Sequence, residues 1–136
     1  MPLIVSVPGK SPAVSDSFVE LLDLYPTTSA LCGLEVPARL QGKDLTPILN
    51  DPKQQVRDAT FTISGGDKAF LWREDRWAFI QYGEDASKGM ELFDMHQDPQ
   101  QFTNLANSPA HQQQVKHLRA KIAAKLAAIR HNDLQP

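Results

Sequence analysis

The chain has 136 residues, 41% of them hydrophobic and 22% charged, which suits one globular domain or a small domain with part of another. A formal net charge of −2 argues against a nucleic-acid partner, and no apolar run is long enough to span a membrane. The opening MPLIVSVPGK lacks the features of a signal peptide, and the single Cys32 excludes a disulfide framework and a cysteine metal cluster.

The first segment, Leu3 to Val7, is rich in β-branched residues and predicts a short buried strand that stops at Pro8-Gly9. No compatible strand follows it closely in the chain. Two interpretations stay open: the strand belongs to a sheet encoded upstream, or it adds to the edge of the sheet that forms later.

Helical spacing then appears over residues 15–32, in two pieces that we expect to be separated by a break near Leu24. The second piece begins at about Pro26, which fits a first helical turn, with Asp23 as its cap and Gly33 as its left-handed stop. Cys32 is expected to be a buried, inert thiol. The proline-rich residues 33–58 predict an extended surface connection with one turn around residues 45–49.

Four strands and a helix follow. The strands are predicted over residues 59–63, 70–73, 77–82 and 90–95, and the short turns between them predict an antiparallel meander. Ser108-Pro109 predicts the start of a helix whose apolar stripe covers one face of that sheet. The stripe consists of Val115, Leu118, Ile122, Leu126 and Ile129. We interpret the basic residues Lys116, Arg119, Lys121, Lys125 and Arg130 as a solvated face rather than a binding surface.

The predicted fold class is therefore α+β. A small four-stranded antiparallel sheet is packed by a long C-terminal helix, and a strand and short helices precede it.

No self-contained catalytic motif is present: the chain lacks a GxSxG, a Gly-rich phosphate loop and an HExxH. His96 lies near Asp94 and Asp98, and this trio either holds a cation or serves the turn at Pro99. We favour the turn, because aspartate side chains accept backbone N–H groups at such changes of direction.

The two tryptophans, Trp72 and Trp77, either stack on sugars or belong to the core, and the core is the more common place for tryptophan in a small sheet.

Three stretches of the chain resemble the C-terminal end of the sulfatase family, the alkaline-phosphatase-like hydrolases of sulfate esters. The first extends from Pro2 to Leu49 and contains PLIV, PG and then VELLDLYPTTSALCGLEVPARLQGKDLTPIL. The others are WREDRWAFIQY and ELFDMHQDPQQFTNLA, where family members commonly show ELYD, DP and NLA. PLIVSVPGK and DLYPT are most similar to the iduronate-2-sulfatase type.

The resemblance implies that residues 1–54 are the C-terminal edge of a large α/β sulfatase domain and residues 55–136 its small C-terminal subdomain. Family catalysis uses a formylglycine, made from Cys or Ser in a CxPSR-like or CxAGR-like motif, and a calcium ion held by Asp and Asn oxygens. Cys32 lies in ALCGL instead. We therefore assign no catalytic or metal-binding residue to this chain, expect both cofactors in the part encoded upstream, and expect the chain alone to be inactive.

One substrate-binding residue is carried over from the resemblance. In iduronate-type sulfatases, a DK pair ahead of a strand contributes a lysine to the substrate pocket, and here Asp67-Lys68 precedes Arg73. The Lys68 ammonium is expected to attract the carboxylate or sulfate of an acidic sugar. The alternative is a solvated hairpin lysine.

The expected function is thus that of a sulfatase fragment that borders the pocket for a sulfated saccharide, such as an iduronate 2-sulfate. A free-standing acidic-saccharide-binding module, and a homo-oligomer formed through the exposed edge of residues 1–50, are the competing hypotheses. The resemblance also implies an exported parent enzyme, in the periplasm, outside the cell or in a lysosome-like compartment.

Overall fold

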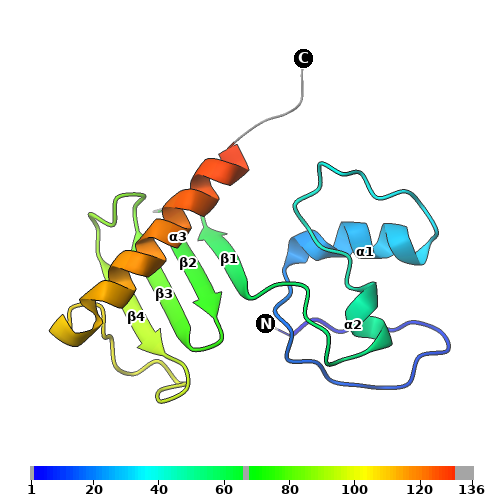
Figure 1. The fold of residues 1–136 in the computed structure, drawn as a ribbon, viewed down its shortest axis with the longest axis horizontal. Coiled ribbons are helices and arrows are strands. Elements are labelled where there is room, and N and C mark those ends of the chain that lie inside the picture. Colours follow the sequence, from blue (N-terminus) through cyan, green and yellow to red (C-terminus); the bar gives the residue numbers. More distant parts are fainter. Residues whose placement is uncertain (1, 66–67, 131–136) are drawn as a thin grey trace. The chain divides into compact units, whose positions relative to one another are not determined.

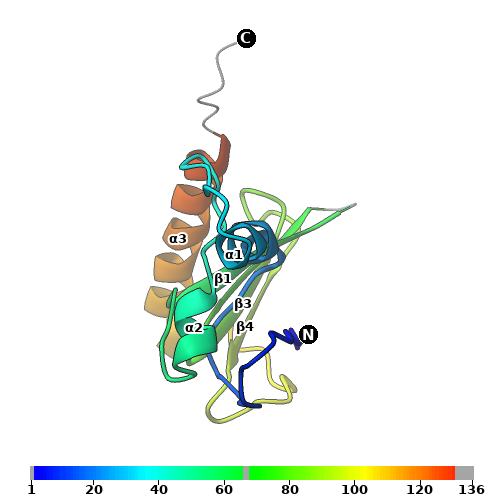
Figure 2. The same cartoon turned by 90° about the vertical axis from the view of Figure 1, so that its right-hand side faces the viewer.

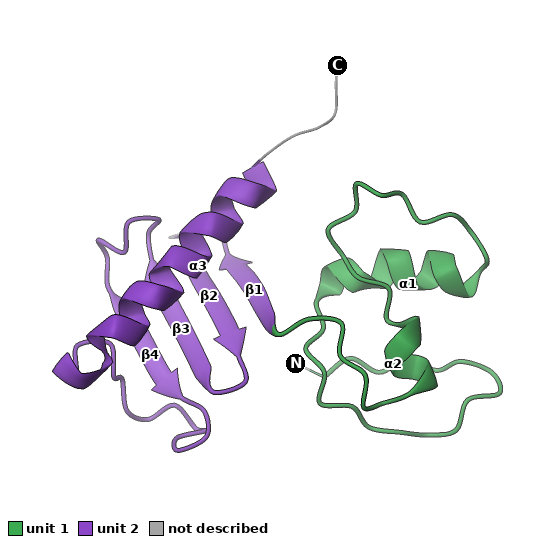
Figure 3. Cartoon of the chain, in the orientation of Figure 1, with its two compact units in different colours: residues 1–58 green, residues 59–136 purple. Residues whose placement is uncertain are grey.

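The structure is a computed structural model that describes residues 2–65 and 68–130. The chain forms two compact units, unit 1 over residues 1–58 and unit 2 over residues 59–136 (Figure 3). No helix among the described residues is long and apolar enough to cross a membrane.

Unit 2 contains the predicted meander. Its strands are β1 (Ala59–Ser64), β2 (Ala69–Glu74), β3 (Trp77–Tyr82) and β4 (Met90–Asp94), and each pairs antiparallel with the next in one four-stranded sheet. The register places Phe61, Trp72, Phe79 and Leu92 opposite one another in one row across the strands. Because side chains alternate between the faces of a sheet, this row gives one face an apolar surface.

That apolar face is covered by α3 (Gln112–Arg130), which lies across the strands (Figure 1) and on one side of the sheet (Figure 2). Val115, Leu118, Ile122 and Leu126 of α3 are buried with Phe70, Phe79 and Leu92, and Ile129 packs against them. Trp72 and Trp77 pack against the same cluster, so their interpretation as core residues is confirmed.

The start of this helix differs from the prediction. Pro109–His111 form a 3-10 turn, η2, and Ser108 makes no side-chain capping hydrogen bond. Instead, the Ser108 backbone carbonyl accepts the N–H of His111, and proline at the first position removes one donor that would otherwise need a cap.

Unit 1 contains little regular structure: the 3-10 turn η1 (Leu21–Asp23), α1 (Leu24–Leu31) and α2 (Thr46–Asn50). The expected break near Leu24 is wrong, because η1 leads directly into α1 and Pro26 lies in the first turn of that single helix, where no N–H partner is needed. Gly33 has φ +68° and its N–H binds the Ala30 carbonyl, which confirms the left-handed stop.

The predicted strand over Leu3 to Val7 is not formed. A strand requires a neighbour to accept and donate its backbone hydrogen bonds, and the sheet of the described residues consists of β1 to β4 alone. The interpretation that this segment adds to the later sheet is therefore wrong. Ile4 is 89% exposed, so the segment is also not buried as predicted.

Candidate functional site

Lys68 lies where two loops of unit 2 meet at one end of the sheet. It directly precedes β2, and its carbonyl accepts the N–H of Gly83 from the β3–β4 loop at 3.0 Å. Its backbone is left-handed, with φ +53°, and its side chain is 69% exposed. Asp67, the other half of the expected pair, lies outside the described residues.

The Lys68 side chain lies near Glu84 of the β3–β4 loop, which is itself paired with Arg130 of α3. The Lys68 ammonium is 4.0 Å from a Glu84 carboxylate oxygen, and Arg130 at the end of α3 donates to that same oxygen at 2.5 Å. The hydrogen bond from Arg130 holds the pKa of Glu84 below its usual range. Arg130 thus lies closer to the Glu84 carboxylate than Lys68 does, and the exposed Lys68 ammonium fits both interpretations of this residue, a substrate contact and a solvated hairpin lysine.

Asp94 organises the turn that follows β4. It accepts the backbone N–H groups of His96 and Gln97 at 3.1 and 3.3 Å, and it binds the Arg76 guanidinium at 2.7 Å. The hydrogen bond from Arg76 holds the pKa of Asp94 below its usual range.

Asp98 accepts the N–H of Thr103 at 2.7 Å, so the interpretation of these acids as turn residues is confirmed. His96 points its Nε2 at Asp75, 2.9 Å away, rather than at Asp94 or Asp98. Among residues 2–65 and 68–130, no group of three or more histidines, cysteines and acids could hold a metal ion.

Asn104, in the NLA stretch, ties the lead-in of the final helix to the sheet. Its Oδ1 accepts the N–H groups of Leu92 and Ala106 at 3.0 and 2.9 Å, and its amide donates to the Met90 carbonyl at 3.1 Å. This stretch is therefore scaffold that positions α3.

Asp23 is the most highly connected side chain of unit 1, a role that the sequence did not indicate. Its fully buried carboxylate accepts the N–H groups of Glu20 and Lys43, each at 2.7 Å, and both ends of the Arg57 guanidinium. It occupies the N-cap position of α1, as predicted, but its side chain makes no capping bond to that helix. Burial alone would raise the pKa of Asp23, but these hydrogen bonds outweigh it, so the pKa lies below its usual range.

The loop that reaches Asp23 depends on Gly42. A Cβ at Gly42 would lie 2.0 Å from the Leu22 carbonyl oxygen, so only glycine allows this approach. The next residue, Lys43, then donates its N–H to Asp23, and Thr27 accepts the N–H of Leu45 at 3.0 Å. The DLYPT and GKDL stretches are therefore joined by polar contacts.

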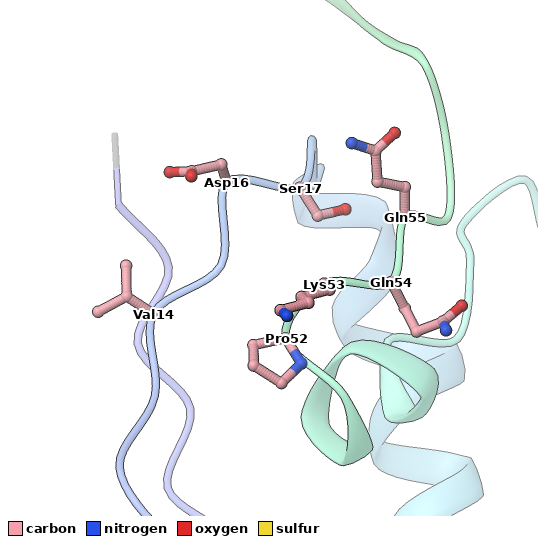
Figure 4. A pocket seen from close by; sticks show the side chains of 7 residues that line it. All are labelled: Val14, Asp16, Ser17, Pro52, Lys53, Gln54 and Gln55. Carbon is pink, nitrogen blue, oxygen red and sulfur yellow. The ribbon is translucent and has the colours of Figure 1, made fainter.

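A shallow pocket of about 400 Å³ lies within unit 1, between residues 14–17 and 52–55 (Figure 4). The Ser15 hydroxyl joins the two segments by donating to the Pro52 carbonyl at 2.7 Å. Lys53 is the only cation among the seven lining residues, and no histidine stands beside Ser17 to act as a base. The pocket therefore lacks both a nucleophile–base pair and a cationic cluster for a sulfate group.

Cys32 is exposed at the end of α1, contrary to the expected buried thiol. The reason is that the buried side of α1 is its polar side, so the apolar side that carries Cys32 faces outward. Within the described part of the chain, Cys32 belongs to no group of three or more histidines, cysteines and acids.

Comparison with known proteins identifies relatives over nearly the whole chain. The model of a family described as N-sulphoglucosamine sulphohydrolase, C-terminal, matches residues 1–128. Human arylsulfatase K is 29% identical over 118 residues, which cover 78% of this chain and 22% of that protein. An arylsulfatase of Clostridium perfringens is 27% identical over 130 residues, which cover 87% of this chain and 24% of that protein. The chain thus spans less than a quarter of these relatives.

Solved structures show the same fold. A Bacteroides thetaiotaomicron protein assigned as a sulfatase superposes with a TM-score of 0.70 at 28% identity, covering 78% of this chain and 24% of that one. A 2-O GAG sulfatase superposes with a TM-score of 0.69 at 28% identity and the same coverage. The predicted α+β fold of a sheet packed by a long helix is confirmed.

Proposed function

The chain belongs to the family of N-sulphoglucosamine sulphohydrolase C-terminal domains, and from this membership we propose that its parent enzyme removes the 2-O-sulfate of an acidic sugar. The observation that carries the choice of position is the 28% identity to a 2-O GAG sulfatase over 78% of this chain. The resemblance of PLIVSVPGK and DLYPT to the iduronate-2-sulfatase type supports the same substrate.

In this proposal the chain is the non-catalytic C-terminal part of the enzyme. Hydrolysis of a sulfate ester requires a nucleophile and a cation that draws off negative charge. The formylglycine and the calcium ion that supply this chemistry in the family belong to the part of the enzyme outside this chain. Export of the parent enzyme stays a prediction from the resemblance.

Lys68 is the residue that we expect to reach the substrate. Its ammonium is exposed and is carried by a loop held to the β3–β4 loop, and the carboxylate that pairs with it among the described residues, Glu84, lies 4.0 Å away. A sugar carboxylate or sulfate that approaches this end of the sheet gains a charge-assisted contact without displacing a tight ion pair. We assign Lys68 a role in binding and orienting the substrate, because the groups that react with the sulfate ester lie outside this chain.

The test uses a chimera in which this chain replaces the region of the 2-O GAG sulfatase that it matches. The assay substrate is a 2-O-sulfated unsaturated disaccharide. We expect the chimera to hydrolyse it and the isolated chain not to. Lys68→Ala is expected to raise KM by about tenfold, the value of one lost charge contact, with kcat nearly unchanged.

Lys116→Ala is the matched control, because Lys116 is an exposed lysine on α3. Turnover by the isolated chain would contradict its non-catalytic role. Equal kinetics for the two lysine variants would contradict the role of Lys68. Binding of the disaccharide by the isolated chain, together with an inactive chimera, would favour the alternative saccharide-binding module.

A further inference from the structure

The loop between β3 and β4 is held by side chains from two elements of unit 2. From the sheet, the buried Gln81 donates to the carbonyls of Gly83 and Glu84 at 3.2 and 2.8 Å. From the helix, Arg119 of α3 donates to the Asp85 carbonyl at 2.9 Å. A buried amide costs stability unless hydrogen bonds compensate for it, so the place of Gln81 is explained by the loop that it holds.

The loop and the residue ahead of β2 also contain backbone in an unfavourable conformation. Among the described residues, three that are not glycine have a positive φ: Lys68 at +53°, Ala86 at +63° and Gln101 at +60°. Two of these three lie in the segments that the hydrogen bond from Gly83 to the Lys68 carbonyl joins. Such conformations persist only where the surroundings impose them, so the contacts hold the two segments in a definite arrangement.

This arrangement fixes the Glu84 carboxylate beside the Lys68 ammonium. Arg130 donates to Glu84 Oε1 at 2.5 Å, and the Lys68 ammonium lies 4.0 Å from the same oxygen. The hydrogen bond from Arg130 holds the pKa of Glu84 below its usual range, so the carboxylate is charged at neutral pH. At a separation of 4 Å in water, a unit charge changes the affinity of an ammonium for an anion by about fivefold.

We propose that Glu84 is a specificity-determining residue of the Lys68 site and that Arg130 is a positioning residue that acts through Glu84. This proposal rests on the proposed function, from which it takes the substrate anion at Lys68. Glu84 disfavours a second anionic group close to the one that Lys68 binds, because like charges placed together exclude a partner. Arg130 draws Glu84 away from Lys68 and so keeps the ammonium open to the substrate.

The substrate class follows from this pair of charges. Lys68 alone would attract any polyanion, and more strongly as the number of sulfates rises. With Glu84 fixed beside it, the site favours an acidic sugar whose anionic group has hydroxyl groups as neighbours. A further sulfate close to that group is rejected by repulsion, which is the negative element that specificity requires.

Acylation of lysines in the isolated chain tests the geometry without any enzyme activity. A succinimidyl acetate reacts with the uncharged amine, which a close carboxylate disfavours, and peptide mass spectrometry measures the rate at each lysine. Arg130→Gln is expected to slow acylation of Lys68 about threefold, because it releases Glu84 toward the ammonium. Glu84→Gln is expected to speed it about fivefold. Lys116, an exposed lysine on α3, should keep its rate in both variants.

The chimera with the 2-O GAG sulfatase extends the test to the substrate. It is assayed with the 2-O-sulfated unsaturated disaccharide and with the same disaccharide carrying a further 6-O-sulfate on its hexosamine. Glu84→Gln is expected to lower KM for the first about fivefold and for the second more strongly, with kcat nearly unchanged. Arg130→Gln is expected to raise both KM values about threefold, because the released Glu84 competes for Lys68.

The opposite signs of the two variants distinguish this proposal from a structural role, which would change Lys68 in the same direction in both. Glu84 and Arg130 have side chains that are 40% and 58% exposed, so both variants should fold, and far-ultraviolet circular dichroism verifies this.

Two results would overturn the proposal. The first is a change of the same sign, or no change, in the acylation of Lys68 in the two variants. The second is an equal fall of KM for the two disaccharides in Glu84→Gln. An inactive chimera together with the expected acylation rates would contradict the proposed function instead, and would leave the arrangement of Glu84 and Arg130 around Lys68 standing.

Discussion

Unit 1 and unit 2 bury different kinds of side chain. In unit 2, Phe79, Leu92, Leu118 and Ile122 are fully buried between the sheet and α3. In unit 1, the carboxylate of Asp23 is fully buried, while the leucines of α1 lie outside. Hydrophobic burial therefore stabilises unit 2, whereas unit 1 is held by polar contacts and leaves the apolar side chains of α1 exposed.

Each unit nevertheless contains the same local device, an aspartate that joins backbone N–H groups to an arginine. Asp23 binds Arg57, whose side chain is 11% exposed, and Asp94 binds Arg76, whose side chain is 50% exposed. Exposed pairs contribute little, whereas removing one partner of a buried pair leaves an uncompensated charge. Both aspartates are buried, so the more exposed arginine is the reason to expect a smaller contribution from the pair in unit 2.

The largest effect is expected in the core of unit 2. Phe79→Ala removes a fully buried ring at the centre of the sheet and should lower the free energy of unfolding of unit 2 by about 3 to 5 kcal/mol. Urea denaturation followed by tryptophan fluorescence measures this, because Trp72 and Trp77 pack on the same core. Phe102→Ala, at an 81% exposed position, is the control and should change it by less than about 0.5 kcal/mol.

A smaller loss is expected in unit 1. Asp23→Asn keeps the shape of the side chain but removes the charge that binds both ends of the Arg57 guanidinium, with Glu20 at 3.4 Å as the remaining carboxylate, and should destabilise unit 1 by roughly 3 kcal/mol. A double-mutant cycle with Arg57→Met, followed by hydrogen exchange of the α1 amides, isolates the pair. Additive effects of the two substitutions would mean that the two side chains do not act together.

The smallest effect concerns pH. Asp23 and Asp94 both have a pKa below the ordinary value of 3.8, so their contribution to stability is complete above that pH and is lost as the pH falls below it. The urea midpoint should therefore be lower at about pH 3 than at about pH 6. Asp23→Asn should reduce the pH dependence of the stability of unit 1 without changing that of unit 2. An unchanged pH dependence in both units would contradict the contribution assigned to the Asp23 carboxylate.

The sequence was sufficient to predict the four strands and the long helix of unit 2, because their apolar residues follow the periodicity of each element. Alternating residues in the strands and the stripe from Val115 to Ile129 report directly which side faces the core. In unit 1 the same reasoning gave wrong predictions. Cys32 and the segment over residues 3–7 were predicted to be buried because they are apolar, but the chain does not cover them and both are exposed.

The connections of unit 1 could not be predicted for a different reason. Asp23 and Arg57 are 34 residues apart, and no local periodicity reports a contact over that distance. From the sequence alone, an aspartate just before a helix, such as Asp23, is explained equally well as the cap of that helix. For Lys68, the structure supplies exposure and neighbours, while its role toward a substrate stays a prediction.

Hydrogen exchange of the isolated chain, read by mass spectrometry, tests the contrast between the units most directly. We predict that the amides of α3, β2 and β3 exchange last and that those of α1, Leu24–Leu31, exchange at least about a hundredfold faster. Protection of α1 equal to that of α3 would show that polar contacts hold unit 1 as firmly as hydrophobic burial holds unit 2, and would contradict the contrast between the units.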